Sequence, residues 1–135
     1  MTNWIKDTTF LRGYDVDLLP LDRKHFSELE KLSKDKRIWE YYIFDGTDSE
    51  KFLETLDFGI AEREKGNQFP FVIYHKSQKK IIGSTRFLDI QPIHKKLEIG
   101  WTWLQPEYWS TEINLECKLF FLNFALKICR LCGFS

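Results

Sequence analysis

The residues most suited to chemistry lie within residues 97–126, where an aromatic segment, a Pro-containing loop and an apolar segment follow one another. Residues 97–104 (LEIGWTWL) are rich in aromatic and β-branched types, which predicts a buried strand ending at the following Gln-Pro pair. A helix is predicted from about Glu112, with Ser110 or Thr111 as its N-cap. Because the first N–H groups and the dipole of a helix favour negative charge, this junction is a candidate anion site.

Other candidate residues each allow two interpretations. Arg86 lies on a predicted strand and has the chemistry to hold a carboxylate or a phosphate, although a strand arginine more often pairs structurally. Trp101 and Trp103 are two residues apart and therefore share one face of their strand. Core packing is the default for both, and lining of a substrate pocket is the alternative. Cys129 and Cys132 have CxxC spacing, but no second pair or nearby histidine completes a site, so we expect free thiols and no metal.

Composition narrows the class of protein. The 135 residues are 43% hydrophobic and 30% charged, which predicts one globular domain over residues 1–135. The net charge of zero gives no reason to expect nucleic acid as a partner. Charged residues interrupt the apolar run 113–131, which favours a buried helix over a membrane span. Residues 1–10 lack the apolar core of a signal peptide, and the three cysteines are an odd number, so we expect a cytoplasmic protein.

Hydrophobic periodicity predicts an alternation of strands and helices. A first strand is expected at 8–19, a helix after Asp22, a short helical piece at 37–42, and a helix from an N-cap within 47–49 to Gly66. Strands at 68–74, 80–89 and 96–104 follow, and then the last helix. This order predicts an α+β fold with helices packed on a mainly antiparallel sheet. We expect the last helix to pack on the sheet through Leu119, Leu122, Phe124 and Leu126 or their immediate neighbours.

The segment 101–118, WTWLQPEYWSTEINLECK, resembles the acetyl-CoA-binding segment of the GNAT superfamily of N-acetyltransferases. The branch it is most similar to is that of the ribosomal-protein acetyltransferases. The likeness extends upstream through residues 71–73, 80–87 and 97–104. It implies a GNAT-like (acyl-CoA N-acyltransferase) fold and transfer of an acetyl group from acetyl-CoA to a primary amine. A protein N-terminus and a small amine both fit the resemblance.

The resemblance also implies roles for individual residues. Pantetheine would pair with the end of the strand at Trp103 and Leu104. The pyrophosphate would lie on the following loop and helix start, at Trp109, Ser110, Thr111, Glu112, Ile113 and Asn114. The acceptor would lie among Trp39, Tyr41, Tyr42, Arg86 and Trp101. For the three aromatic residues near 40, packing is an equal alternative.

Glu98 is the candidate base for the ammonium proton, because acidic residues in this part of the fold serve as bases in some GNAT enzymes. A solvated edge residue is the equal alternative for Glu98. The sequence departs from the family at Glu112, where the common loop has glycine, and at Ser110, where this branch often has glycine. Glu112 either points outward, which we prefer, or weakens CoA binding.

The resemblance covers the N-terminal two-thirds of a usual GNAT domain. Without the remaining elements, we expect the strand at 97–104 to be partly unpaired and the last helix to expose apolar residues. Such surfaces favour association, so a homodimer is expected. An alternative to catalysis is a GNAT-like remnant that is inactive and acts as a binding or self-associating module.

Overall fold

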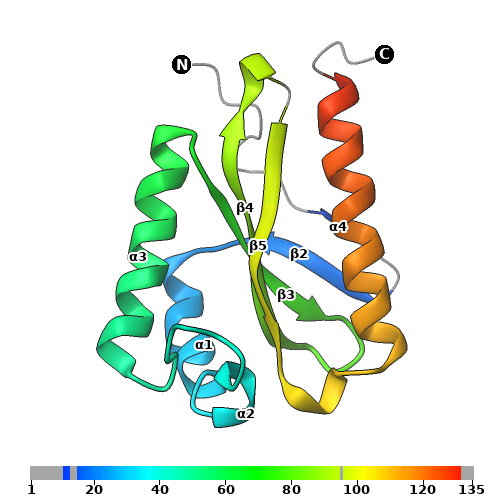
Figure 1. Cartoon of the computed structure of the whole chain (residues 1–135). Helices are drawn as coiled ribbons and strands as arrows, with labels where there is room; N and C mark the ends of the chain where they lie inside the picture. Colours follow the sequence, from blue (N-terminus) through cyan, green and yellow to red (C-terminus); the bar gives the residue numbers. More distant parts are fainter. Residues whose placement is uncertain (1–10, 13–14, 95, 132–135) are drawn as a thin grey trace.

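The computed structural model describes residues 11–12, 15–94 and 96–131 (Figure 1). The strands are β1 (Leu11–Arg12), β2 (Val16–Pro20), β3 (Phe69–His75), β4 (Lys80–Gln91) and β5 (Lys96–Leu104). The helices are α1 (Phe26–Leu32), α2 (Lys36–Trp39), α3 (Ser49–Lys65) and α4 (Glu112–Leu131). The 3-10 turns are η1 (Arg23–His25), η2 (Pro92–His94) and η3 (Pro106–Tyr108).

The five strands form one antiparallel sheet in chain order, with β5 at one edge. Figure 1 shows α3 on one side of the sheet and α4 on the other. Side-chain alternation in β3 separates the two cores: Phe71 and Ile73 pack toward α4, and Val72 packs toward α1 to α3. The chain therefore forms the predicted α+β fold, and its helices cover both faces of the antiparallel sheet.

Local signals in the sequence fix the ends of α3. The Asp48 carboxylate accepts a hydrogen bond from the backbone N–H of Lys51 at 3.2 Å and so caps the helix start. Gly66 ends the helix with a φ of 80°, a left-handed conformation in which glycine avoids the steric cost of a Cβ atom. The predicted N-cap within 47–49 and the predicted stop at Gly66 are both confirmed.

The helix α4 is attached to the sheet by a carboxylate as well as by apolar contacts. Glu116 accepts hydrogen bonds from the backbone N–H groups of Asp15 and Val16, at distances of 2.9 to 3.0 Å. These bonds satisfy the donors at the start of β2, which lies about 100 residues earlier in the chain.

No helix in the described part of the chain has the length and apolar character to cross a membrane.

The prediction of one strand over 8–19 is wrong in its extent. Residues 8–10 lie outside the described residues, and the rest divides into β1 and β2, which pair antiparallel with Leu11 opposite Leu18. The chain therefore reverses between these strands. Alternation of apolar and polar residues continues through both halves of a hairpin, so the period alone does not reveal the reversal.

The prediction for the packing face of α4 holds for the immediate neighbours Phe120 and Phe121 and fails for the three leucines that it named. Leu119, Leu122 and Leu126 are each 52% exposed, whereas Cys117 and Phe121 are buried against the sheet. Ile113 and Phe120 add partly buried contacts to the same core. The side chain of Phe124 lies outside the described residues. Because α4 is apolar on nearly all sides, its periodicity does not select one face.

The strand β5 is not buried along its length, contrary to the prediction for residues 97–104. Only its last two residues, Trp103 and Leu104, are buried, and the earlier residues are exposed or half-buried. An edge strand has one sheet neighbour, so β-forming side chains at its start remain in contact with solvent. The aromatic and β-branched residues therefore indicated a strand correctly, but they did not indicate how much of that strand is buried.

The three cysteines fall into two groups. Cys117 is buried, and burial raises the pKa of its thiol to about 12, so the neutral thiol is retained. The side chain of Cys129 and all of Cys132 lie outside the described residues. Within the described part, no three His, Cys, Asp or Glu side chains are grouped to hold a metal ion.

Candidate active site

The edge strand β5 contains an extra residue relative to its neighbour. Trp103 pairs with Ser84 and Gly100 pairs with Arg86, so β5 advances three residues where β4 advances two. Trp101, within this bulge, has a φ of 52°. A bulge leaves a residue outside the regular ladder and bends its strand. In the described part of the chain β5 has no strand on its outer side, so its outer backbone groups are not paired within the sheet.

The loop after α2 lies against this edge. The Tyr42 hydroxyl donates a hydrogen bond to the carbonyl oxygen of Thr102, and the Thr102 hydroxyl pairs with the Thr85 hydroxyl at 2.8 Å. Burial raises the pKa of Tyr42 above its ordinary value of 10.0, which keeps the phenol protonated as a donor at neutral pH. Tyr42 thus holds the loop against the bulged segment of β5.

An aromatic cluster centred on Trp39 packs between the loop after α2 and the end of β5. The Trp39 ring centroid lies 5.5 Å from that of Trp103, 5.6 Å from that of Phe44 and 5.4 Å from that of Tyr42. Its indole N–H donates to the carbonyl oxygen of Ser33 at 2.8 Å. Trp39 is only 7% exposed, so it belongs chiefly to the core.

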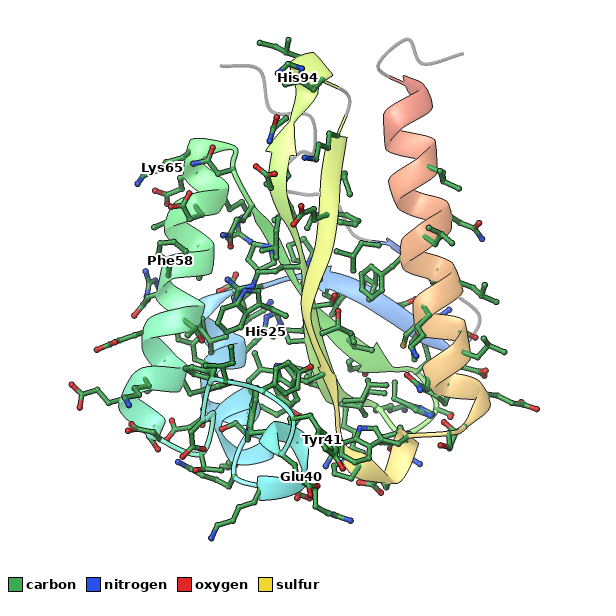
Figure 2. The ribbon with its side chains drawn as sticks, viewed as in Figure 1. His25, Glu40, Tyr41, Phe58, Lys65 and His94 are labelled. Carbon is green, nitrogen blue, oxygen red and sulfur yellow. The ribbon has the colours of Figure 1, made fainter. Side chains whose placement is uncertain are left out.

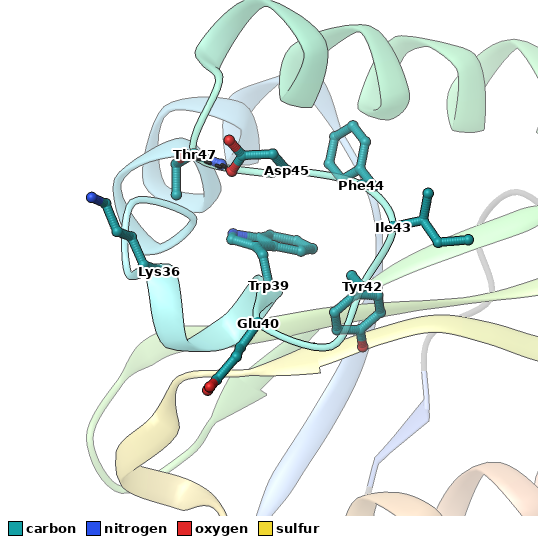
Figure 3. Close-up of a pocket in the computed structure, with 8 residues that line it drawn as sticks. All are labelled: Lys36, Trp39, Glu40, Tyr42, Ile43, Phe44, Asp45 and Thr47. Carbon is teal, nitrogen blue, oxygen red and sulfur yellow. Dashed lines mark hydrogen bonds between the residues drawn. The ribbon is translucent and has the colours of Figure 1, made fainter.

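A pocket of about 240 Å³ lies over Trp39 (Figure 3). Figure 3 shows the loop from Glu40 to Thr47 curving around the indole, with Ile43 on the outer side of the loop. Tyr41 is 94% exposed and does not line this pocket. Figure 2 shows Tyr41 and Glu40 near the α2 end of the molecule. The structure therefore places Trp39 and Tyr42 in one pocket and Tyr41 outside it.

A larger pocket of about 510 Å³ lies between α3 and the β4–β5 pair, and we refer to it as the Arg86 pocket. Its lining residues are Phe44, Lys51, Glu54, Thr55, Phe58, Arg86 and Trp101. The Arg86 guanidinium lies under the Trp101 ring, with its central carbon 5.2 Å from the ring centroid. Both residues were candidates for substrate contact in the sequence, and the structure places them in one pocket.

A neighbouring pocket of about 480 Å³ continues from the Arg86 pocket, because Phe58 and Trp101 line both. Phe58 extends from α3 (Figure 2). Glu62 and Asp89 add acidic side chains to this second pocket. The two pockets together form a groove along the face of the sheet that carries α3.

Glu98 is exposed on β5, with its Cα opposite that of Leu88. Leu88 is two residues from Arg86 on β4, so strand alternation places Glu98 on the same side of the sheet as Arg86. Glu98 lines none of the three pockets described above. Its position on the bulged strand agrees with the sequence interpretation as a candidate base and equally with a solvated edge residue.

The predicted anion site follows directly on the end of β5. Trp109 donates its indole N–H to the carbonyl oxygen of Leu104 at 3.0 Å, which folds η3 back on the strand. Ser110 has a φ of 57°. The Thr111 carbonyl accepts from the backbone N–H of Leu115, so Thr111 occupies the N-cap position of α4. Glu112 is exposed on the first turn, and Ile113 and Asn114 are half-buried beside it.

Sequence reasoning missed several residues that line the Arg86 pocket, among them Phe44, Lys51, Glu54 and Phe58. Phe58 carried a usable signal. It lies off the apolar stripe of α3, and it is 54% exposed in the structure. A large apolar side chain outside the buried stripe of a helix indicates a contact with something other than the core. Phe44, Lys51 and Glu54 carried no comparable signal.

Proteins of known class share this architecture. The family profile described as Acetyltransferase (GNAT) domain matches residues 15–134. A GCN5-related N-acetyltransferase from Brucella melitensis is similar with a TM-score of 0.76 and 19% identity, over 92% of this chain and 57% of that chain. No curated protein matches the chain significantly.

Two further solved structures are similar. The first is an acetyl transferase from Salmonella typhimurium that modifies the N-terminal serine of 50S ribosomal subunit protein L7/L12. Its TM-score is 0.73 and its identity 19%, over 88% of this chain and 69% of that chain. The second is a spermidine N-acetyltransferase from Vibrio cholerae in complex with CoA and spermine. Its TM-score is 0.67 and its identity 19%, over 86% of this chain and 66% of that chain.

The contact between Tyr42 and β5 gives a prediction about stability. We expect Tyr42→Phe to lower the free energy of unfolding by about 1 kcal/mol, because the Thr102 carbonyl loses its donor. Tyr41→Phe is the matched control and should change nothing, since Tyr41 is exposed. Urea unfolding at pH 7 measures both variants.

The same contact has a pH dependence of defined sign. The pKa of Tyr42 is raised in the folded state, so its contribution is complete below the ordinary tyrosine pKa and is lost as the pH rises through the raised value. The difference between wild type and Tyr42→Phe should therefore shrink in strongly alkaline buffer. Equal effects of Tyr41→Phe and Tyr42→Phe at pH 7 would contradict the assignment.

Proposed function

Because the chain belongs to the GNAT family of acetyltransferases, we propose that it transfers an acetyl group from acetyl-CoA to a primary amine. The chain spans 57% of the length of the Brucella melitensis relative. The activity of the whole enzyme is therefore a proposal for this chain, based on the part of the fold that the two proteins share. The observation that carries the proposal is the open, bulged edge of β5, which leads into the start of α4 and borders the Arg86 pocket. One strand end thus adjoins both an anion site and a pocket suited to a small organic group.

Acetyl-CoA, the thioester substrate, fits the edge of β5 and the adjoining anion site. We propose that the edge of β5 at Trp103 and Leu104 pairs with the pantetheine amides, as an added strand would, and that pantetheine displaces the Trp109 indole from the Leu104 carbonyl. The pyrophosphate then lies on the backbone N–H groups of the loop and first turn, at Trp109, Ser110, Thr111, Glu112, Ile113 and Asn114. Exposed N–H groups at a helix start favour this charge.

The acceptor amine fits the Arg86 pocket. In the proposed reaction the neutral amine nitrogen attacks the acetyl carbonyl carbon, a C–N bond forms, and the C–S bond breaks to release the CoA thiolate. Backbone N–H groups at the bulge are suited to stabilise the oxyanion that develops on the carbonyl oxygen. Glu98, on the same strand, is the proposed acceptor of the proton that the amine loses. Trp39, Tyr42, Arg86 and Trp101 are proposed to shape the acceptor side, with Tyr41 at its exposed margin.

A direct experiment tests this function. Purified chain is mixed with acetyl-CoA and either spermidine or a peptide with an N-terminal serine, and the free thiol of released CoA is measured. We expect thiol release that depends on the amine and that falls at least tenfold in Glu98→Gln, while calorimetry shows unchanged affinity for acetyl-CoA. Glu107→Gln is the control, since Glu107 is exposed in η3 and off the sheet. Absence of both acetyl-CoA binding at millimolar concentration and thiol release would refute the proposal.

The carboxylate at Glu112 gives a second prediction. Glu112→Gly is expected to leave the affinity for CoA unchanged or to raise it, because a like charge is removed and the backbone approaches phosphate more easily. Calorimetry with CoA measures the change, and Glu112→Gln separates the effect of charge from that of the Cβ atom. A clear loss of affinity in Glu112→Gly would show that this carboxylate supports binding.

A second candidate function is self-association, and the exposed face of α4 favours it. Leu115, Leu119, Leu122 and Leu126 are 52% to 59% exposed and follow one another at intervals of four, three and four residues. This is the spacing of a coiled-coil seam, in which each leucine packs against the same stripe of a second helix. We propose a symmetric homodimer that buries this stripe.

Light scattering at low micromolar concentration decides this point. We expect twice the chain mass of 16.3 kDa for the wild type and the single mass for a Leu119→Lys and Leu122→Lys double variant. Lys31→Glu, the same change of charge at an exposed position on α1 and away from α4, should leave the dimer intact. A wild-type mass near 16.3 kDa, with a cooperative melt, would exclude the dimer.

A further inference from the structure

The Arg86 side chain is buried without a carboxylate partner. It is only 4% exposed, and no ion pair joins it to an acidic side chain among the described residues. A buried cation normally has a partner of opposite charge, because removal from water is costly for an unpaired ion. The position of this guanidinium therefore needs an explanation other than packing.

The hydrogen bonds of Arg86 leave part of the guanidinium unused. One terminal nitrogen donates to the side-chain oxygen of Gln68 at 3.1 Å, and the other donates to the carbonyl oxygen of Thr55 at 3.3 Å. The buried Nε has no hydrogen-bond partner. A guanidinium has five N–H donors in a fork that matches a carboxylate, so these two neutral acceptors do not satisfy it.

The fold makes room for this side chain. A Cβ atom at Gly59 on α3 would lie 2.9 Å from a terminal nitrogen of Arg86, so glycine is what allows the guanidinium to lie between α3 and Trp101. Burial lowers the pKa of Arg86 to about 10, which still leaves the group charged at neutral pH. The cation is thus held in place under Trp101 and retained in its charged form.

We infer that the Arg86 pocket binds the carboxylate of the acceptor, and hence that the acceptor is an amine that also carries a carboxylate and an apolar group. The inference rests on the proposed function and specifies its substrate class. Lys51 is the second cation of the pocket, and Phe44, Phe58 and Trp101 supply aromatic walls. With Glu54 as the one acid, the pocket has a net charge of about +1, which suits a singly charged carboxylate better than a doubly charged phosphate.

The pocket also places such an acceptor next to the reacting strand. Trp101 lines the pocket and lies within the bulge of β5. A molecule whose carboxylate is bound at Arg86 and whose apolar group contacts Trp101 would therefore lie beside the bulge, whose backbone groups are proposed to stabilise the oxyanion. The volume of about 510 Å³ is within the range of small-molecule sites.

A matched pair of ligands tests the inference. L-phenylalanine and L-phenylalaninamide share the amine and the aromatic ring and differ in the carboxylate. Calorimetry with the whole chain should give a dissociation constant at least tenfold lower for L-phenylalanine, since a charge-assisted pair is lost with the amide. The indole N–H signal of Trp101, identified by its loss in Trp101→Phe, should shift on addition of L-phenylalanine.

Three variants test whether the preference for the carboxylate arises in the Arg86 pocket. Arg86→Gln should abolish the preference for the carboxylate, and Lys51→Gln should reduce it. Lys118→Gln, an equal change of charge on the opposite side of the sheet, should leave it intact. If Arg86→Gln does not fold, as judged by its thermal melt, the exposed Lys51 decides the question, because Lys51→Gln leaves the core unchanged.

Several outcomes would overturn the inference: equal binding of the two ligands, binding of neither at millimolar concentration, or an unchanged preference in Lys51→Gln and in any folded Arg86→Gln. Tighter binding of inorganic phosphate than of L-phenylalanine would assign the pocket to phosphate instead. Titration with acetyl-CoA keeps the two proposals apart. Acetyl-CoA binding without a carboxylate preference refutes only this inference, and the absence of both acetyl-CoA binding and thiol release refutes the proposed function.

Discussion

The extra residue in β5 is the constraint on which the site depends. Between Gly100 and Trp103 the strand advances one residue more than β4, and Trp101 takes up the difference with a positive φ. A non-glycine residue in that conformation costs free energy, which the neighbouring contacts must offset. The Trp101 ring lies over Arg86, and the adjacent Thr102 carbonyl accepts from Tyr42. The bulge is therefore held by contacts from β4 and from the loop after α2.

These contacts join four segments of the chain: the loop after α2, α3, β4 and β5. Phe44 from the loop after α2 meets Trp101 with ring centroids 5.6 Å apart, and Thr55 of α3 accepts from Arg86 of β4. A substitution in the loop or in α3 would therefore change the backbone geometry of the bulge. The residues proposed to shape the acceptor side thus also contact the strand proposed for catalysis, which would link substrate recognition to the position of the oxyanion donors.

Much of the fold follows from local signals in the sequence, and most of the pocket does not. Asp48 and Gly66 mark the ends of α3, and the strand at 96–104 was predicted at its observed bounds, because caps and turn residues act through their own backbone. The buried face of α4 and the division of the first strand depend on which surfaces meet in three dimensions. The GNAT resemblance and fold are confirmed, whereas the lining of the Arg86 pocket by Phe44 and Phe58 required tertiary contacts.

The state of Arg86 connects ligand binding to stability. In the free protein the cation is compensated by the Trp101 ring and by two neutral acceptors, which do not replace the water that it lost. A carboxylate in the pocket would supply the missing charge in a setting where solvent screens little, so binding and folding favour each other. The same unpaired cation disfavours an apolar or cationic occupant, because either would enclose the charge without neutralising it. With the proposed carboxylate ligand, the pocket would be selective through the cost of the wrong ligand as well as through attraction for the right one.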